Sequence, residues 1–268
     1  RGLIRTNFEN PIMTMPDRKV SFRFYEELND FLPKEKRKKT FSYNFRYNQS
    51  VKDAIEALGI PHAEVDLILV NGNSVDFSYI LKNGDYVSVY PVFESLDISL
   101  VSRLRNAPLR QVKFILDVHL GKLCKYLRIL GFDTYYRNDL EDSEIVSISV
   151  NENRIILTRD IGILKNGKVT HGYWVRSQNS RQQLWEVIHR FDLENILQPF
   201  YRCISCNGLI HPVEKEKIEH LLRENTKRFF TDFYQCNACG KVYWEGTHYE
   251  NMQEFVNNII SRKKLLIS

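Results

Sequence analysis

The chain has 268 residues, of which 43% are hydrophobic and 26% are charged, and its formal net charge is +5. This length suits two or three domains, and the composition is that of an ordinary globular protein, which argues against a disordered chain. No apolar stretch approaches the roughly 18 to 20 residues that cross a bilayer, and no signal-peptide core precedes the first domain. We therefore expect a soluble, cytoplasmic protein that spans no membrane. Because the sequence begins with Arg1 and not Met, residues 1–12 are interpreted as an expression remnant or a processed end.

The first part of the chain shows the period of two that is typical of half-buried strands. Apolar side chains alternate in "VSFRF" and again in "FSYNFRY". The segment "QSVKDAIEALGIP" then predicts a helix that begins after Ser50 and ends at Gly59. Two further strands, "DLILV" and "DYVSVYPVF", follow it. The order strand-strand-helix-strand-strand predicts a ubiquitin-like β-grasp domain over residues 18–99.

Strands alternate with helices over residues 111–198. The segments "FILD", "DTYYR", "RIILTRD" and "HGYWVRS" predict four strands, and the segments between and after them carry helical apolar periodicity. Short strands that alternate with helices predict a mostly parallel sheet covered on both faces. The predicted fold class is therefore α/β.

Two of these predicted strands end in an aspartate. Asp117 follows "FIL", and Asp160 follows "IILTR". In an open α/β sheet, ligands bind outside the carboxyl ends of the strands, so both acids are expected at one crevice. Asp142 opens the helix "DSEIVSISV" and is expected to face the same crevice. Taken singly, a strand-end aspartate is as often a turn former, and Asp142 is a good helix N-cap.

Converging carboxylates repel one another unless a cation lies between them. Mg²⁺ or Mn²⁺ held by two to four carboxylates activates a water and stabilises the departing oxygen of a phosphodiester. The sequence offers no convincing nucleophilic serine or cysteine. We therefore expect a catalytic Mg²⁺ or Mn²⁺ bound by Asp117, Asp142 and Asp160, with Asp133 and Asp139 as alternative ligands.

The helix after the first strand-end acid carries a basic face. Lys122, Lys125 and Arg128 recur at steps of three, opposite its apolar side chains. Such cations are either a solvated surface or a set that holds RNA phosphates beside the acids. Arg159, next to the second strand-end acid, is a further cation for the RNA backbone.

Four of the five cysteines form two Cys-x-x-Cys pairs. In an intracellular chain this pattern indicates metal ligation before disulfides. Cys203, Cys206, Cys236 and Cys239 suit one structural Zn²⁺ with four thiolate ligands, each pair at a tight turn as in a zinc ribbon. The alternatives are an iron–sulfur site or a redox pair. Cys124 lies in an apolar helical pattern and is predicted to be a core residue.

The zinc ribbon is predicted over residues 199–252, with a C-terminal helix that extends to 268. Tyr243 and Trp244 follow the second cysteine pair, where exposed aromatic rings would stack on unpaired RNA bases. Aromatic rings are equally expected in the minimal core of a zinc ribbon, so both roles stay open.

Together these segments resemble a known family. "FILDVHLGKLCKYLRILGFDTYY", "NRIILTRD", "FYRCISCNGLI" and "FYQCNACGKVYWEGTHYENM" resemble the Mut7-C domain, a PIN-like ribonuclease domain followed by a zinc ribbon, over about residues 110–252. "LVNG" and "LKNGDYVSVYPVF" are similar to the ubiquitin-like domain often fused to it. The resemblance implies that Asp117, Asp142 and Asp160 belong to the PIN-like acidic cluster; the usual fourth acid has no convincing counterpart.

The expected function is that of a Mg²⁺- or Mn²⁺-dependent ribonuclease, and three modules would suit a structured RNA such as tRNA. The alternative is a non-catalytic RNA-binding or adaptor protein with a degenerate nuclease domain, in which the β-grasp domain recruits a protein partner. A sulfur-carrier role is disfavoured, because the last β-grasp strand runs into "ESLDIS" and not into a terminal Gly-Gly.

Overall fold

The computed structural model describes residues 18–91 and 112–266, with side chains as far as Ser261. These residues separate into two compact units: the first takes residues up to 60 and 65–91, and the second takes 61–64 and the chain from 112 onward. The "ESLDIS" segment lies outside the described residues. Within the described ranges, no helix has the length and apolar character needed to cross a membrane.

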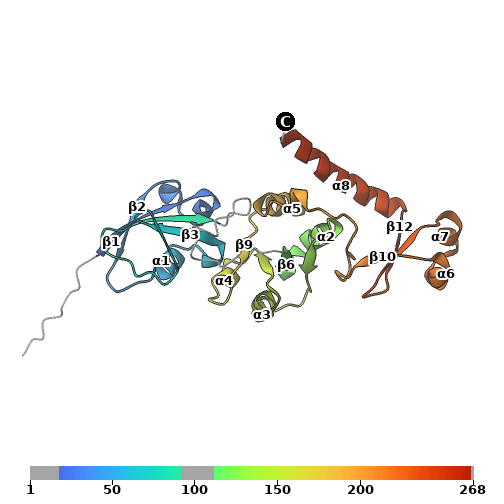
Figure 1. Cartoon of the computed structure of the whole chain (residues 1–268), viewed down its shortest axis with the longest axis horizontal. Helices are drawn as coiled ribbons and strands as arrows, with labels where there is room; N and C mark the ends of the chain where they lie inside the picture. The colour runs from blue at the N-terminus through green and yellow to red at the C-terminus, as the bar shows by residue number, and fades with distance from the viewer. Residues whose placement is uncertain (1–17, 92–111, 267–268) are drawn as a thin grey trace, which may run out of the picture. The chain divides into compact units, whose positions relative to one another are not determined.

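The first unit is a five-stranded mixed sheet with one helix, α1 (Val51–Ala57), packed against it (Figure 1). The strand order is β2-β1-β5-β3-β4. Its strands are β1 (Arg18–Phe24), β2 (Phe41–Phe45), β3 (Val65–Val70), β4 (Asn73–Val75) and β5 (Tyr86–Pro91). As predicted, α1 begins after Ser50, whose side chain accepts the N–H of Asp53. The predicted β-grasp fold is confirmed, with β4 as a short additional strand.

The second unit opens with a four-stranded parallel sheet in the order β7-β6-β8-β9. The strands are β6 (Lys113–Leu116), β7 (Asp133–Tyr135), β8 (Ile155–Thr158) and β9 (Gly172–Trp174). The helices are α2 (Gly121–Ile129), α3 (Asp142–Glu152), α4 (Ile161–Leu164) and α5 (Ser180–Arg190). The predicted parallel α/β sheet is thus confirmed.

Helices cover both faces of this sheet, and successive side chains of each strand pack alternately against one face and the other. Phe114 and Leu116 pack with α2 and α5 on one face, whereas Ile115 and Ile156 pack with α3 and α4 on the other (Figure 1). Successive side chains of a strand point to opposite faces, so a central strand with helices on both sides must be apolar throughout. This explains the uninterrupted "FIL" and "IIL" runs.

A small antiparallel sheet follows, with the strands β10 (Ile210–Val213), β11 (Phe233–Cys236) and β12 (Val242–Trp244). The short helices α6 (Lys215–Ile218) and α7 (Glu224–Phe229) connect β10 to β11. Ile218, Leu222 and Phe233 form a separate small core beneath them. This sheet is the predicted ribbon.

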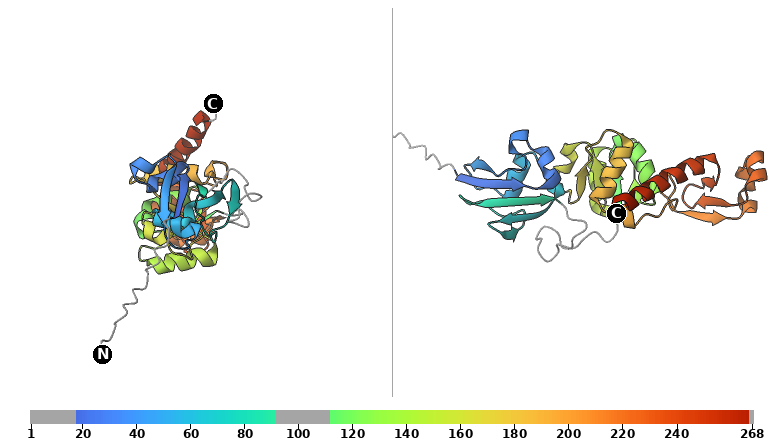
Figure 2. Two further views of the ribbon diagram at one scale, coloured as in Figure 1. Left: turned by 90° about the vertical axis from the view of Figure 1, so that its left-hand side faces the viewer. Right: turned by 90° about the horizontal axis from the view of Figure 1, so that it is seen from above.

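The C-terminal helix α8 (Thr247–Leu266) returns from the ribbon to the parallel-sheet part of the second unit (Figure 2). Val256 and Ile259 are buried in the same core cluster as Phe114. Phe255 stacks on Tyr126 of α2, with 4.8 Å between the ring centroids. The ribbon is therefore attached to the α/β core at both of its ends.

Candidate active site at the carboxyl edge of the parallel sheet

The two strand-end acids lie at one edge of the parallel sheet. β6 and β8 are direct neighbours, with Leu116 paired to Leu157. Asp117 immediately follows β6, and Asp160 comes two residues after β8. Since parallel strands end at the same edge, the sheet brings both acids to its carboxyl edge, where ligands of α/β sheets bind.

Thr158, the last residue of β8, connects the two strand ends. Its hydroxyl donates to Oδ2 of Asp117 at 2.9 Å and accepts the backbone N–H of Asp160 at 2.8 Å. The Thr158 side chain is fully buried and Asp117 is 5% exposed, so the bond between them is shielded from water. Thr158 was not predicted from the sequence, although a hydroxyl at the end of a buried apolar strand is a signal, because it requires a hydrogen-bond partner.

Asp160 also has a local structural role. Its side chain is exposed, and its Oδ1 accepts the N–H of Gly162 at 2.7 Å, which starts α4. A Cβ at Gly162 would lie 3.0 Å from that oxygen, so a larger residue would crowd the carboxylate. The turn-forming role left open by the sequence is therefore present, in a side chain that is exposed.

Asp142 is the first residue of α3 and is exposed. The N-cap is Glu141, whose N–H donates to Oε2 of Glu144 at 3.1 Å, so the N-cap role considered for Asp142 is wrong. Within the described ranges, the four cysteines are the group of three or more metal-binding side chains that could share one ion. Asp117, Asp142 and Asp160 do not form a second such group there.

Asp133, considered as an alternative ligand, belongs to the opposite edge of the sheet. It opens β7 and pairs in register with Lys113, the first residue of β6. Its carboxylate receives hydrogen bonds from Arg154 at 2.6 Å and Asn207 at 2.9 Å, and Arg202 lies 3.3 Å away. Burial alone would raise the pKa of Asp133, but these partners outweigh it and leave the pKa below its ordinary value. The ligand role is wrong for Asp133, because these three side chains occupy its oxygens.

Asp139, the other alternative ligand, is bound at the surface. It pairs with Arg137 at 2.9 Å, and that hydrogen bond is the main cause of a lowered pKa for Asp139.

The predicted basic face of α2 divides into two exposed residues and one buried residue. Lys122 and Lys125 are exposed, as is Arg159 after β8. Arg128 is only 4% exposed. A phosphate-binding role is wrong for Arg128, since its guanidinium is enclosed and engaged elsewhere.

Arg128 joins the sheet to the ribbon. Its guanidinium donates to the carbonyl of Thr134 at 2.8 and 3.0 Å, and to the carbonyls of Ile204 and Ser205 at 3.0 Å each. Ile204 and Ser205 are the two residues between the first pair of cysteines. The first cysteine turn is thus fixed to the amino edge of the sheet, away from Asp117.

The four paired cysteines are arranged for a tetrahedral metal. Their Sγ atoms all lie within 4.8 Å of one another, with Cys203 and Cys239 3.7 Å apart and Cys206 and Cys236 3.4 Å apart. Zn–S bonds of about 2.3 Å place tetrahedral thiolates about 3.8 Å apart, so the residues fit one Zn²⁺. Four thiolate donors fill its coordination shell, which indicates a structural role.

Tyr243 and Trp244 are neighbours on β12 and point to opposite sides of it. The Tyr243 hydroxyl lies 3.0 Å from Sγ of Cys203, whereas Trp244 lies near Phe230, with 6.4 Å between ring centroids. Trp244 is 37% exposed. Both side chains nevertheless line one cavity of the second unit, so the stacking role remains a prediction.

Comparison with known families agrees with this arrangement. The family model of the Mut7-C RNAse domain matches residues 112–256, and that of the Mut7-C ubiquitin domain matches residues 17–97. A search of curated proteins finds no match. The first match spans more than half of the chain and includes the parallel sheet, both cysteine pairs and the start of α8. The chain has a ubiquitin-like domain followed in sequence by a ribonuclease-like α/β unit. It therefore belongs to the Mut7-C RNAse domain family.

Proposed function

We propose that the chain is a metal-dependent ribonuclease that hydrolyses phosphodiester bonds of RNA at the carboxyl edge of its parallel sheet. The observation that carries this proposal is that Asp117 and Asp160 follow the neighbouring strands β6 and β8 at the same edge of the sheet. Thr158 is hydrogen-bonded to both residues. Asp142, at the start of α3, is proposed as the third acid, and it lies within the family match over residues 112–256.

The oxygen donors at this edge fit a hard divalent cation. Mg²⁺ keeps several of its waters and binds through one or two carboxylates together with substrate phosphates, so the three acids need not meet at one point. A bound Mg²⁺ or Mn²⁺ would supply an activated water and offset the charge on the departing oxygen. Asp117 is held in place by Thr158, while Asp160 and Asp142 are exposed to an incoming phosphate and its ion.

Exposed cations flank this edge and are proposed to hold the RNA backbone. Lys122 and Lys125 lie on α2, which starts just after Asp117, and Arg159 precedes Asp160. Each contact with a phosphate releases counterions from the RNA, so binding is expected to weaken steeply with salt. A structured RNA such as tRNA is the proposed substrate, because the ribbon offers a second surface at the other edge of the sheet.

The test is the double variant Asp117→Asn with Asp160→Asn, assayed for cleavage of a labelled tRNA with and without added Mg²⁺ or Mn²⁺. Wild-type protein should cleave only with the added ion, and the double variant should not cleave. Asp232→Asn, which removes an exposed acid of the ribbon, is the matched control and should cleave normally. Undiminished cleavage by the double variant would show that the site lies elsewhere.

A second candidate is a non-catalytic RNA-binding or adaptor protein, in which the β-grasp domain recruits a protein partner. The observation that favours it is that, among the described residues, Asp117, Asp142 and Asp160 do not form a group that could share one ion. This candidate predicts salt-sensitive RNA binding by the wild-type protein, with no cleavage in either metal. The same assay therefore decides between the two.

A further inference from the structure

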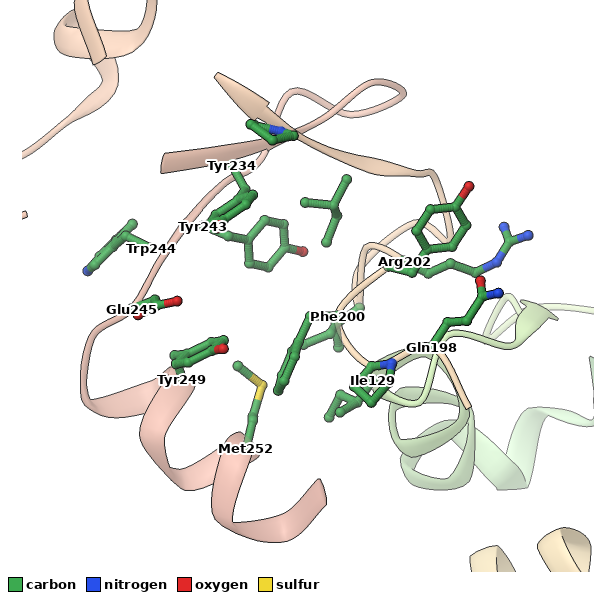
Figure 3. A pocket seen from close by; sticks show the side chains of 15 residues that line it. Ile129, Gln198, Phe200, Arg202, Tyr234, Tyr243, Trp244, Glu245, Tyr249 and Met252 are labelled. Carbon is green, nitrogen blue, oxygen red and sulfur yellow. The ribbon is translucent and has the colours of Figure 1, made fainter. Parts of the chain in front are cut away.

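A cavity of about 700 Å³ opens between the ribbon and the beginning of α8 (Figure 3). This volume is within the range of small-molecule binding sites. Its lining includes the aromatic residues Phe200, Tyr234, Tyr243 and Tyr249 and the charged residues Arg202 and Glu245. The cavity and the acids belong to opposite edges of the parallel sheet, because Arg128 attaches the ribbon at the amino edge and the acids follow the carboxyl ends of the strands.

One wall is the uncovered face of the ribbon sheet. Pro212, Tyr234 and Tyr243 are paired across the three strands and share a face, because directly paired residues point to the same side. The other face carries Phe233 and Val242, which α6 and α7 cover. The ribbon therefore presents two tyrosine rings outside its small apolar core, of which Tyr243 also contacts Sγ of Cys203 through its hydroxyl.

The facing wall consists of a second pair of rings. Phe200 and Tyr249 lie 4.8 Å apart between centroids, at an interplanar angle of 41° (Figure 3). Phe200 has φ of 62°, in the left-handed region that non-glycine residues seldom adopt, and its N–H donates to the carbonyl of Ile129 at 2.8 Å. A strained backbone that aims an aromatic ring into a cavity is a feature of binding sites.

The charges of the lining residues favour a base over a phosphate. The guanidinium of Arg202, the lining cation, is paired with Asp133 at 3.3 Å and donates to the carbonyl of Asn207 at 3.0 Å. The other charged lining residue is Glu245, exposed at the rim near Tyr249. A carboxylate repels phosphate but accepts two parallel hydrogen bonds from adjacent N–H donors.

We propose that this cavity binds one unpaired RNA base, guanine in preference, between the ribbon tyrosines and the Phe200–Tyr249 pair. Aromatic rings stack on any base, whereas guanine is the RNA base with two adjacent donors, N1–H and N2–H, for the carboxylate of Glu245. The inference rests on the proposed function in that it takes RNA as the substrate. It adds a recognition site, separate from the acids, that binds an unpaired base of a single-stranded RNA segment.

The position of the cavity sets a length requirement on the RNA. β6 and β8 have four residues each, so the two edges of the sheet lie about 13 Å apart. At the rise of about 3.4 Å per nucleotide of a stacked strand, an RNA held at both edges spans about four nucleotides, and an extended strand spans fewer. The base in the cavity is therefore not the one next to the cleaved bond.

The test measures RNA binding by the full, zinc-loaded chain, with Asp117→Asn added to all variants so that no RNA is cut. Fluorescence anisotropy compares short single-stranded G, A, C and U oligonucleotides with a duplex of equal length. Tyr249→Leu should weaken binding of single strands about 10-fold and leave duplex binding unchanged. Tyr249→Phe, which keeps the ring, should bind normally, and Glu245→Gln should lose the preference for G.

Phe229→Leu is the matched control, because Phe229 is a 70% exposed aromatic residue of α7 in the same ribbon. It should bind like the parent. Equal binding by Tyr249→Leu and the parent, or equal affinity for single strand and duplex, would overturn the inference. Pocket-dependent binding without cleavage by the wild-type chain would refute only the nuclease, whereas cleavage with no effect of Tyr249→Leu on binding would refute only the pocket.

Discussion

Two donors hold the carboxylate of Asp117 at the sheet edge. The buried hydroxyl of Thr158 donates to Oδ2, and the backbone N–H of His119 lies 3.4 Å from Oδ1. A buried carboxylate is stable only where its oxygens are hydrogen-bonded, so the threonine both stabilises and aims it. We therefore propose Thr158 as a positioning residue that acts through Asp117.

Thr158→Val is expected to lower kcat about 10-fold with little change in KM, because valine keeps the shape but cannot donate to Asp117. Steady-state kinetics on a labelled RNA measure the two constants separately. Thr158→Ser, which retains the hydroxyl, should restore most of the rate. If valine and serine variants were equally active, the hydroxyl would have no positioning role.

Asp133 is expected to make stability depend on pH. Its pKa is lowered in the folded chain, so its stabilising effect is complete above the ordinary value of 3.8 and is lost as the pH falls through the lowered pKa. Asp133→Asn should cost about 1–3 kcal/mol of unfolding free energy at neutral pH. Urea unfolding at several pH values should show this difference shrinking below pH 3.8. A difference that stayed constant down to the lowest pH would contradict the assignment.

At the scale of elements, α2 shows why a helical pattern can mislead. Lys122, Lys125 and Arg128 have the spacing of one exposed face, yet only the two lysines are exposed. The first cysteine turn covers the end of that face. Arg128 donates hydrogen bonds both to the carbonyl of Ile204 in this turn and to the carbonyl of Thr134 in β7. Arginine suits this position because its planar fork reaches several carbonyls together.

Arg128→Met should destabilise the second unit by about 3 kcal/mol, since it removes the donor to the buried carbonyl of Thr134 and to the partly buried carbonyls of Ile204 and Ser205. Chemical denaturation followed by circular dichroism measures the loss. Lys125→Met, on the exposed part of the same helix, is the control and should change stability by less than about 0.5 kcal/mol. If Arg128→Met bound RNA more weakly while its stability was unchanged, Arg128 would have the phosphate-binding role after all.

The sequence predicted what depends on local pattern. The apolar runs before Asp117 and Asp160, the cap at Ser50 and the spacing of the cysteines each follow from neighbours along the chain, and all of these appear in the fold. Residues whose role depends on distant partners were missed or misassigned. Arg128 faces a turn contributed by residues far along the chain, and Asp133 meets Asn207 from that same turn.

The aromatic cavity was not predicted from the sequence for the same reason. Its rings come from β11, β12, α8 and the segment after α5, and periodicity within one element does not reveal which face another element leaves uncovered.

At the scale of the second unit, the metal site and the α/β core are linked. The ribbon is attached by Arg128 before the sheet β10–β12 and by α8 after it. The stability of a structural zinc site is folding free energy, so loss of the metal should disorder the ribbon and weaken its attachments.

Removal of zinc by a chelator should therefore lower the melting temperature of the α/β core as well as unfold the ribbon. Calorimetry with and without chelator, together with metal analysis showing one zinc per chain, measures this. Cys206→Ser should reproduce the effect, whereas Cys124→Ala, a buried cysteine outside the metal group, should keep its zinc. An unchanged core transition after zinc loss would show that the two parts are independent.

The return of α8 also has a consequence for synthesis on the ribosome. The chain emerges from the amino end, so the strands β6 to β9 are exposed long before Val256 and Ile259, which complete their core. Until α8 arrives, the hydrophobic surface of α2 that Phe255 later covers is exposed to solvent or to a chaperone. The nascent protein should thus complete its α/β core only after the ribbon has been made, which would delay the proposed RNA cleavage until translation of this region is complete.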